Sequence, residues 1–368
     1  MQPRRVAIVH DWLNGMRGGE KALEAVLELF PDAEVFTLLL ERDKISPAIS
    51  RRKITTSFIQ HLPMAKSKYR FLLPLFPMAV ERFDLSPYDL VISTSHCVAK
   101  GASAPRGALH ICYCFSPMRY VWVFQEEYLG TSTLKSYIFS PLLAGLRSWD
   151  ARSCERVDHF VAISRTVADR IARFYRRESE VIFPPVDTDF FVPGEKEEDF
   201  FLVVSALVPY KRVDLAIEAF NELKLPLVII GDGPEYRRLR KIAGRTVSFR
   251  GWVSNEDVRE AYQTCRALIF PGVEDFGLTP VEAQACGRPV IAFARGGVRE
   301  SVQDGVTGMF FREQSVGSLK AAVTAFGRMR FNPAIARQNS LRFSRHLFKR
   351  RLREYIARRF EEFRLDKP

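Results

Sequence analysis

Two glutamates, Glu274 and Glu282, flank a turn that leads from a predicted strand into a predicted helix. The apolar run 267–270 comes before them and is typical of a buried parallel strand. Backbone N–H groups at the start of a helix, together with the helix dipole, favour a bound phosphate or diphosphate. Carboxylates beside such an anion repel it unless they turn away and accept hydrogen bonds from hydroxyl groups. The stretch therefore predicts a phosphate site with sugar or ribose hydroxyls close by.

The start of this helix is marked in the sequence. Thr279 is a favourable N-cap, Pro280 suits the first helical position, and Glu282 completes a Thr-x-x-Glu capping box. The amides expected to face a ligand are those of Gly277, Leu278 and Thr279. A plainer interpretation is that Glu282 only caps its helix and that Glu274 is a solvated turn residue, because capping boxes are common.

Apolar runs alternate with helical patterns along both halves of the chain, as parallel α/β sheets require. The expected strands are 6–10, 35–38, 88–93, 108–115 and 158–164 in the first half, and 201–207, 227–230, 247–249, 267–270 and 290–293 in the second. Two adjacent prolines and a charge run between Val181 and Asp199 indicate a linker. We therefore expect an N-terminal domain over 1–190, a C-terminal domain over 191–345 and a terminal helix over 346–368.

Length and composition suit a soluble protein of two domains: the chain has 368 residues, 47% hydrophobic and 27% charged. No apolar stretch is long enough to span a bilayer, and the N-terminus does not look like a signal peptide. The six cysteines form no C-x-x-C pair, so we expect reduced thiols rather than disulfides or a zinc site. These features predict a cytoplasmic protein.

The formal net charge of +12 predicts an anionic partner, for which a nucleotide, a phospholipid surface and nucleic acid all qualify. Basic and apolar residues lie side by side in the segment from Arg51 to Asp84, which suits an anionic membrane surface. An ordinary buried helix hairpin with a solvated basic face explains the same pattern. The tail from Arg342 predicts an amphipathic helix with a basic outer face.

Other residues that could contact a ligand follow the predicted strands, because open α/β sheets bind ligands beyond the carboxyl ends of their strands. Lys211 and Arg212 follow the first strand of the second half, where they could bind a diphosphate, although such pairs are often only solvated. Gly18 and Gly19 allow close backbone approach before a helix. The strand ends of the first half carry Asp11, Trp12, His96, Arg119 and Tyr120.

The paired glutamates, with Phe276-Gly277 between them and Ala283 to Val290 after them, resemble the signature of the retaining nucleotide-sugar glycosyltransferases of family 4. Lys211, the Gly231-Asp-Gly-Pro234 turn and the Gly-Gly turns occur in the matching order. The resemblance implies the GT-B fold, in which two Rossmann-like doubly wound domains face an interdomain cleft and the last helix crosses back to the N-terminal domain.

The resemblance also implies roles for residues. The second domain would bind the donor, with Glu282 on ribose, Glu274 on the donor sugar, the backbone at Gly251 and Val253 on the base, and Lys211 and Arg212 on the diphosphate. The first domain would bind a glycan or polyprenyl-linked glycan acceptor, and no nucleic acid is expected. Asp11, Trp12, Arg119 and Tyr120 are expected on the acceptor side, and His96 is expected to be catalytic together with Glu274, Lys211 and Arg212. Neither a cofactor nor a metal ion is expected beyond the nucleotide diphosphate sugar. The segment 208–214 is similar to a mannosyltransferase-like branch of bacterial surface polysaccharide synthesis, so GDP-mannose is the first expectation and a UDP-sugar the second.

The chain departs from the family pattern at two places. Relatives commonly have a histidine where this chain has Phe115, so the role of that histidine is either lost or taken by His96. Family members usually have Gly-Arg where this chain has Ser205-Ala206, and Arg212 is the expected substitute for the missing arginine.

Overall fold

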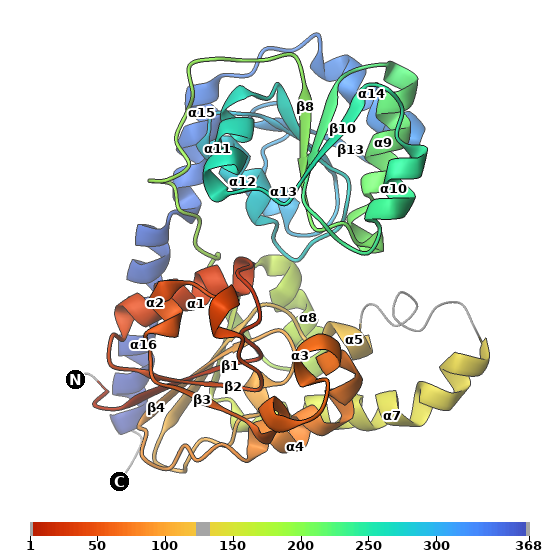
Figure 1. Ribbon diagram of the computed structural model, residues 1–368. Helices are drawn as coiled ribbons and strands as arrows, with labels where there is room; N and C mark the ends of the chain where they lie inside the picture. The colour runs from red at the N-terminus through yellow and green to blue at the C-terminus, as the bar shows by residue number, and fades with distance from the viewer. Residues whose placement is uncertain (1–2, 123–132, 366–368) are drawn as a thin grey trace. The chain divides into compact units, whose positions relative to one another are not determined.

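The chain forms two compact units, seen in the computed structural model, which describes residues 3–122 and 133–365 (Figure 1). The first unit runs to Pro185 and includes the chain from Phe348 onward, and the second unit is Val186–Leu347. The division therefore falls at the two adjacent prolines, Pro184 and Pro185. Within the described residues, no helix is both long and apolar enough to cross a lipid bilayer.

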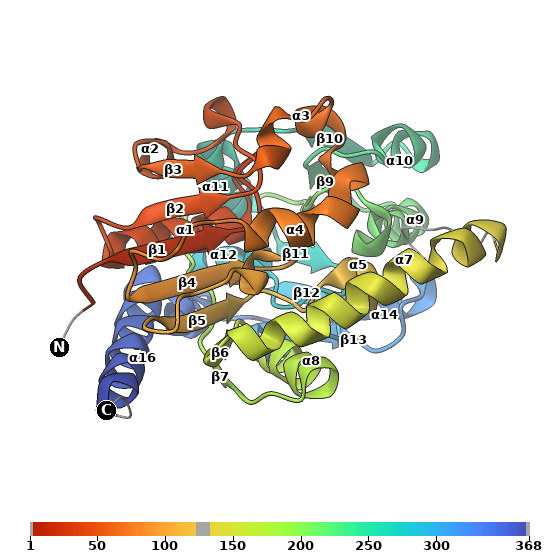
Figure 2. The ribbon, with the colours of Figure 1, turned by 90° about the horizontal axis from the view of Figure 1, so that it is seen from below.

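The first domain is built on a seven-stranded parallel sheet with the order β3-β2-β1-β4-β5-β6-β7, which Figure 2 shows from below. Its strands are β1 (Val6–His10), β2 (Glu34–Thr37), β3 (Ile54–Thr56), β4 (Leu90–Ser95), β5 (Leu109–Cys114), β6 (His159–Ala162) and β7 (Ser179–Val181). The central strands β1, β4 and β5 are buried along their whole length, which explains their continuous apolar runs. The edge strands β3 and β7 were not expected from the sequence.

Helices and 3-10 segments connect these strands. The helices are α1 (Gly18–Leu29), α2 (Pro47–Ser50), α3 (Ala65–Lys68), α4 (Phe76–Glu81), α5 (Arg119–Trp122), α7 (Thr133–Arg152) and α8 (Arg165–Tyr175). Helix α8 shows how the sequence sets their ends. The Ser164 side chain accepts a hydrogen bond from the Val167 amide at its start, and Arg176 adopts a left-handed conformation at its end.

A buried ion pair lies in the core of the first domain. Lys100 Nζ is 2.9 Å from Asp150 Oδ1, and both side chains are almost fully buried. The other carboxylate oxygen of Asp150 accepts hydrogen bonds from Trp122 Nε1 and the Tyr175 hydroxyl, each at 2.7 Å. Burial alone lowers the pKa of Lys100, but the charge of Asp150 raises it above its ordinary value. This network fixes α5, which carries Arg119 and Tyr120, against α7 and α8.

The second domain has a six-stranded parallel sheet with the order β10-β9-β8-β11-β12-β13. Its strands are β8 (Phe201–Val204), β9 (Leu227–Ile230), β10 (Val247–Gly251), β11 (Ala267–Phe270), β12 (Val290–Phe293) and β13 (Gly308–Phe311). Its helices are α9 (Val213–Leu223), α10 (Tyr236–Ile242), α11 (Asn255–Thr264), α12 (Leu278–Ala285), α13 (Val298–Ser301), α14 (Val316–Phe326) and α15 (Pro333–Ser340). Residues of α9 and α14 pack on β8, β9 and β11 to form its core. Strand β13, at the sheet edge, was not expected from the sequence.

The last helix, α16 (Arg345–Leu365), joins the first domain from Phe348 onward. The Phe348 and Tyr113 rings lie 5.5 Å apart, and further buried apolar residues follow at helical spacing. Its basic residues make ion pairs with the same domain, among them Lys349 with Glu28 at 2.6 Å and Arg358 with Glu180 at 2.8 Å. The expected amphipathic helix and its return to the first domain are confirmed.

Candidate functional site

Each sheet has one point where the strand order reverses, between β1 and β4 in the first domain and between β8 and β11 in the second. The chain connections that follow the two strands at such a switch point run to opposite faces of the sheet. A crevice therefore forms between them, outside the carboxyl ends of the two strands. The residues that follow β1, β4, β8 and β11 are therefore the first place to look for a ligand site. In both domains a carboxylate paired with a basic side chain joins the loops on the two sides of the switch point.

In the second domain, Lys211 Nζ pairs with Glu274 Oε1. Lys211 ends the 3-10 turn Pro209–Lys211 after β8, and Glu274 lies in the loop after β11. The two side chains keep 15% and 23% of their surface exposed, so solvent reaches both. A methyl group at Gly272 would lie 2.8 Å from Lys211 Cα, so a glycine is needed where the two loops meet. The sequence predicted both residues in the site but not their pairing.

The backbone of Glu274 is held by the turn at Gly296 and Gly297. The Gly297 amide donates to the Glu274 carbonyl at 2.9 Å, and Gly296 has φ +81°. A methyl group would come within 2.4 Å of the Glu274 carbonyl oxygen at Gly296 and within 2.2 Å of the Asp275 carbonyl oxygen at Gly297. No larger residue fits at either position without moving the loop that carries Glu274.

Helix α12 begins earlier than the sequence predicted. It runs from Leu278 with Gly277 as N-cap at φ +86°, and no side chain caps it. The expected capping box of Thr279 and Glu282 is therefore wrong, because Thr279 already lies inside the first turn. The amides of Leu278 and Thr279 belong to that turn, where an α-helix supplies no internal acceptors.

The Glu282 carboxylate is largely buried and contacts the neighbouring helix α11. Glu282 is only 6% exposed, and its Oε2 accepts a hydrogen bond from the Tyr262 hydroxyl at 3.1 Å. Burial and the Glu282 carboxylate raise the pKa of Tyr262 well above its ordinary value, so the phenol keeps its proton and donates. Tyr262 was missed in the sequence, where it is one apolar position of an amphipathic helix and carries no separate signal.

Arg212 has a left-handed backbone, with φ +51°, and its Nε lies 3.3 Å from Asp214 Oδ1. This partner is on the first turn of the helix that Arg212 precedes, so the guanidinium is partly engaged within its own segment. Its side chain remains 35% exposed. That Arg212 takes the place of the arginine which family members have near Ser205-Ala206 stays a prediction.

The loop after β8, which has Ser205-Ala206 where relatives have Gly-Arg, packs closely against the loop after β9. A methyl group at Gly231 would come within 1.9 Å of the Ser205 carbonyl oxygen, and one at Gly233 within 2.4 Å of the Leu207 carbonyl oxygen. The Leu207 amide also donates to the Asp232 carbonyl at 2.9 Å. The Gly-Asp-Gly-Pro turn therefore supports the segment that leads to Lys211.

The expected base contacts lie at the end of β10. Gly251 has φ +70° and accepts a hydrogen bond from the Gly231 amide at 2.8 Å, which joins the ends of β9 and β10. Val253 follows in the loop before α11. Between them Trp252 is 83% exposed. The structure thus places Gly251 at the same edge of the sheet as Lys211, as parallel strands require.

In the first domain, Asp11 directly follows β1 and is fully buried. Its two carboxylate oxygens accept hydrogen bonds from four successive backbone amides after β4, those of His96, Cys97, Val98 and Ala99, at 2.6–2.9 Å. Asp11 Oδ2 also lies 3.0 Å from His96 Nδ1. Burial alone would raise the pKa of Asp11, but the charge and hydrogen bonds of His96 lower it to about 2.

The His96 ring is therefore held through Nδ1, and its side chain stays 30% exposed. The Trp12 ring lies edge-on to it at 4.4 Å and is itself only 3% exposed. Asp11 and Trp12 thus support His96 from the interior, whereas the sequence suggested direct contact with an acceptor. The Phe115 ring lies 6.4 Å from the His96 ring, so the histidine that relatives have at that position would be a neighbour of His96.

The remaining expected residues of the first domain lie near this group or just outside it. Gly18 and Gly19 begin α1, and a methyl group at Gly19 would contact the Phe115 ring at 3.5 Å. Arg119 is half-buried on α5. Tyr120 is on the same helix, but its side chain lies outside the described part of the structure.

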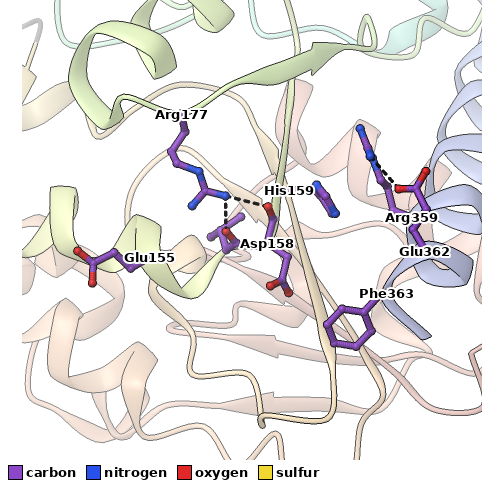
Figure 3. A pocket seen from close by; sticks show the side chains of 8 residues that line it. Glu155, Asp158, His159, Arg177, Arg359, Glu362 and Phe363 are labelled. Atoms are coloured by element: carbon purple, nitrogen blue, oxygen red, sulfur yellow. Dashed lines mark hydrogen bonds and ion pairs between the residues drawn. The ribbon is translucent and has the colours of Figure 1, made fainter. Parts of the chain in front are cut away.

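A separate pocket of about 460 Å³ lies in the first domain between the start of β6 and α16 (Figure 3). It is at the amino end of the strand, opposite the edge that carries His96. Its arginines already have partners: Arg177 donates to the carbonyls of Val157 and Asp158 at 2.8 Å, and Arg359 pairs with Glu362 at 2.8 Å. Hydrogen-bonding groups of both arginines are therefore already engaged by the protein.

Comparison with known families agrees with this geometry. The model "Glycosyl transferases group 1" matches residues 186–339, and "Glycosyltransferase Family 4" matches residues 32–190. Each match falls on one of the two domains, and together they cover most of the chain. The expected resemblance to glycosyltransferase family 4 is confirmed.

Individual relatives are more distant. An uncharacterised glycosyltransferase, MJ1178, of Methanocaldococcus jannaschii is 28% identical over 45% of this chain and 48% of its own length. The D-inositol 3-phosphate glycosyltransferase of Mycobacterium tuberculosis (strain H37Ra) is 30% identical over 42% of this chain and 37% of its own length. The alignments thus span less than half of these curated relatives.

Solved structures show the same fold at low identity. Alr3699/HepE of Anabaena, crystallised with UDP and glucose, has a TM-score of 0.71 at 16% identity, covering 95% of this chain and 99% of its own. The sucrose-phosphate synthase of Thermosynechococcus elongatus has a TM-score of 0.71 at 17% identity, covering 98% of this chain and all of its own. The predicted GT-B fold, with two Rossmann-like domains, is confirmed.

Proposed function

We propose that this chain, which resembles the glycosyltransferases of family 4 over both of its domains, is a retaining hexosyltransferase that uses a nucleotide diphosphate sugar. The observation that carries the proposal is the Lys211–Glu274 ion pair, which joins the two sides of the switch point in the second sheet. The first turn of α12 begins four residues after Glu274 and supplies backbone amides. A cation, a carboxylate and helix amides together suit a phosphate group that is attached to a sugar.

Each group of the second domain has a role in this proposal. Lys211 and the amides of Leu278 and Thr279 bind the diphosphate, and Arg212 adds charge at its edge. Glu274 accepts hydrogen bonds from donor sugar hydroxyls, and Glu282 from ribose hydroxyls. The pairing with Glu274 keeps Lys211 extended across the switch point before the donor arrives, so little side-chain freedom is lost on binding.

The proposed reaction exchanges one bond to the anomeric carbon for another on the same face. The acceptor hydroxyl oxygen attacks that carbon while its bond to the phosphate oxygen breaks, and the hydroxyl proton passes to the departing phosphate oxygen. Charge accumulates on the diphosphate as it leaves. Lys211 and the α12 amides stabilise it there, as preorganised donors do in other group transfers. No protein carboxylate needs to form a covalent intermediate.

His96 is the proposed contact of the first domain with the reacting sugars. Its Nδ1 is engaged by Asp11, so Nε2 is the ring nitrogen left for a ligand. Its neighbour Phe115 stands where relatives have a histidine, and we propose that His96 takes over that contact. Gly18 and Gly19 bring the start of α1 close to the same group. Arg119 and Tyr120 on α5 complete the proposed acceptor side.

The proposed acceptor is a glycan or a polyprenyl-linked glycan, and the proposed place of action is the cytoplasm, with peripheral contact to its membrane. The proposed donor is GDP-mannose, from the similarity of residues 208–214 to mannosyltransferases of bacterial surface polysaccharide synthesis. A UDP-sugar is the second candidate, supported by the structure of Anabaena HepE with UDP-glucose. Neither proposal includes a metal ion or another cofactor.

A nucleotide panel tests the proposal. Melting temperatures are measured with GDP, UDP, ADP and dTDP, and we expect one nucleotide at 100 times its dissociation constant to stabilise the second domain by about 2.7 kcal/mol. The protein is then incubated with the matching sugar nucleotide and with extracts that contain glycan acceptors. The release of the free nucleoside diphosphate is measured. The absence of any shift with all four nucleotides would contradict the proposal and favour a module that binds another anion.

Two variants test the proposed roles of Lys211 and Glu282. Lys211→Met should lower kcat by about 10²- to 10³-fold, the usual effect of losing one preorganised donor. Glu282→Ala should lower kcat/KM by about 100-fold, since a hydrogen bond to a charged group contributes up to about 3 kcal/mol. Tyr262→Phe is the matched control, because it removes the hydroxyl that contacts Glu282 and keeps the carboxylate. Full turnover in Glu282→Ala would remove Glu282 from the site.

A further inference from the structure

The chain between Asp43 and Glu81 contains seven lysines and arginines and no aspartate or glutamate. Three of these cations, Lys66, Lys68 and Arg70, are exposed within the segment from Met64 to Met78. We call this segment the 64–78 face. It consists of α3, the 3-10 helix Tyr69–Leu75 and α4, which Figure 1 shows close together in the first domain.

The 64–78 face has a buried side and an apolar outer side. Tyr69 and Phe76 are buried, and their rings lie 5.2 and 6.1 Å from the Trp12 ring. Phe71, in contrast, is 78% exposed and Met64 is 64% exposed. The buried rings agree with the interpretation as a buried hairpin with a solvated basic face, and the exposed apolar side chains beside the cations are what the membrane-surface interpretation requires.

Folding of this domain does not require the exposed side chains. The core needs Tyr69 and Phe76, and polar residues in place of Met64 and Phe71 would leave these contacts intact. Large apolar side chains that gather at the surface mark interaction sites. Met78, at the far end of the segment, is 40% exposed as well.

We propose that the 64–78 face is a docking surface for an anionic lipid bilayer. Exposed apolar side chains next to lysine and arginine suit the boundary between headgroups and acyl chains, where the apolar groups insert and the cations contact anionic headgroups. A second copy of the chain suits the face poorly, because it would bring the same positive charge to a protein of net charge +12. The short helical pieces lie on the surface and need not span the membrane.

The position of the face adds a functional consequence, which rests on the proposed function. Trp12 contacts Tyr69 and Phe76 on one side and the His96 ring, at 4.4 Å, on the other. The buried rings of Tyr69, Phe76 and Trp12 thus connect the inner side of the docking segment with the proposed acceptor contact. An acceptor with a lipid anchor would reach His96 while its anchor stayed in the bilayer.

Vesicle cosedimentation tests the docking surface without any donor or acceptor. The full chain is mixed with vesicles of phosphatidylcholine alone or with 30% phosphatidylglycerol, at 0.05 and 0.5 M NaCl. We expect binding only to the anionic vesicles and weaker binding at high salt. Lys66→Gln with Lys68→Gln should lower the partition coefficient about 25-fold, since each cation near such a surface contributes about fivefold. Phe71→Ser should lower it at least about tenfold through lost apolar burial.

Matched variants of the second domain serve as controls. Trp252→Ser removes an equally exposed aromatic ring, and Arg237→Gln with Lys241→Gln removes two exposed cations of α10. These controls should bind like the wild type. Unchanged binding by the variants of the 64–78 face, or no binding of the wild type to anionic vesicles, would overturn the proposal. So would a concentration-dependent dimer in solution that Phe71→Ser abolishes.

Failure of the docking surface and failure of the proposed function can be told apart. The nucleotide-induced shift in melting temperature reports the second domain and should be unchanged in Phe71→Ser. A variant that keeps this shift and loses vesicle binding supports the docking surface. A wild type that binds vesicles but responds to no nucleotide contradicts the proposed function and leaves the docking surface supported.

Discussion

The two switch points of this molecule are bridged by side-chain pairs that differ in how deeply the carboxylate is buried. In the first domain, Asp11 joins the loops after β1 and β4 through His96 and four backbone amides, and it is fully buried. In the second domain, Lys211 and Glu274 join the loops after β8 and β11, and both remain partly exposed. The first pair thus buries its carboxylate and leaves only the imidazole partly exposed, at 30%, whereas the second leaves both partners partly exposed.

This difference teaches how burial decides what a charged pair can do. Asp11 has its hydrogen-bonding capacity filled by protein groups, so exchanging a partner would leave buried amides unsatisfied at a cost of about 1–3 kcal/mol each. Lys211 and Glu274 can exchange partners more easily, because solvent reaches both side chains and can take the place of a lost partner. A ligand can therefore compete for Lys211 and Glu274, whereas Asp11 serves as a positioning group for His96.

Acid should produce the largest contrast between the domains. His10 and His110 are buried in the first domain, and burial lowers the pKa of each to about 4. Between pH 6.5 and 4 the unfolded chain binds protons that these folded histidines do not, so stability falls as pH decreases, by about 3 kcal/mol for each histidine. The histidine that the structure describes in the second domain, His346, is exposed.

Tryptophan fluorescence can follow this contrast during urea unfolding from pH 7.5 to 4.5. Trp12, Trp122 and Trp149 report the first domain, and Trp252 the second. A Trp252→Phe variant isolates the first signal, and a variant that keeps only Trp252 isolates the second. His110→Gln should remove about half of the pH dependence that the two histidines give the first domain, since His10 remains and glutamine can still bond Ser93. Equal acid sensitivity of both domains would contradict the prediction.

Removal of one buried charge should come next in size. Lys100→Met leaves Asp150 without its cation in the core, and loss of one partner of a buried pair costs about 3–5 kcal/mol. Lys320→Met is the matched control on the second domain, where Lys320 pairs with the exposed Glu222, and it should cost about 1 kcal/mol or less. Free energies of unfolding from urea titrations at pH 7.5 check both values. Equal costs would mean that the Asp150 network does not need its lysine.

The smallest predicted effect concerns the contact of His96 with the sugars. His96→Gln should lower kcat/KM by about tenfold, the value of one hydrogen bond of about 1.4 kcal/mol, with little change in melting temperature. Phe115→His in that background should recover part of the loss, because the two rings are neighbours. His61→Gln, at an exposed position of the same domain, is the control. Wild-type kinetics in His96→Gln would remove this histidine from the site.

The sequence predicted the central strands because burial on both faces gives continuous apolar runs, as in β9, β11 and β12. It missed β3, β7 and β13, which lie at sheet edges and are less buried, so they have mixed composition. Residue types at the strand ends indicated Lys211, Glu274 and His96 as site residues. Which of them pair depends on the strand order, which no local pattern records.

The helix-start prediction failed for a related reason. Thr279 and Glu282 have the spacing of a capping box, but Glu282 finds a partner in Tyr262, which comes from a different helix. Tertiary contacts of this kind override local preference, and the N-cap moves to Gly277, where φ +86° excludes most other residues. The sequence thus has the residues of a capping box at Thr279 and Glu282, but in the structure they do not form one.

Four successive amides that converge on one point form an anion-binding site, whatever anion occupies it. In the first domain that anion is the side chain of Asp11, so the site is filled by a residue of the chain itself. A free phosphate could enter only by displacing a carboxylate that the fold itself provides. The first sheet therefore fills this anion site with a residue of its own chain, whereas at the switch point of the second sheet the carboxylate of Glu274 pairs with a lysine and stays partly exposed.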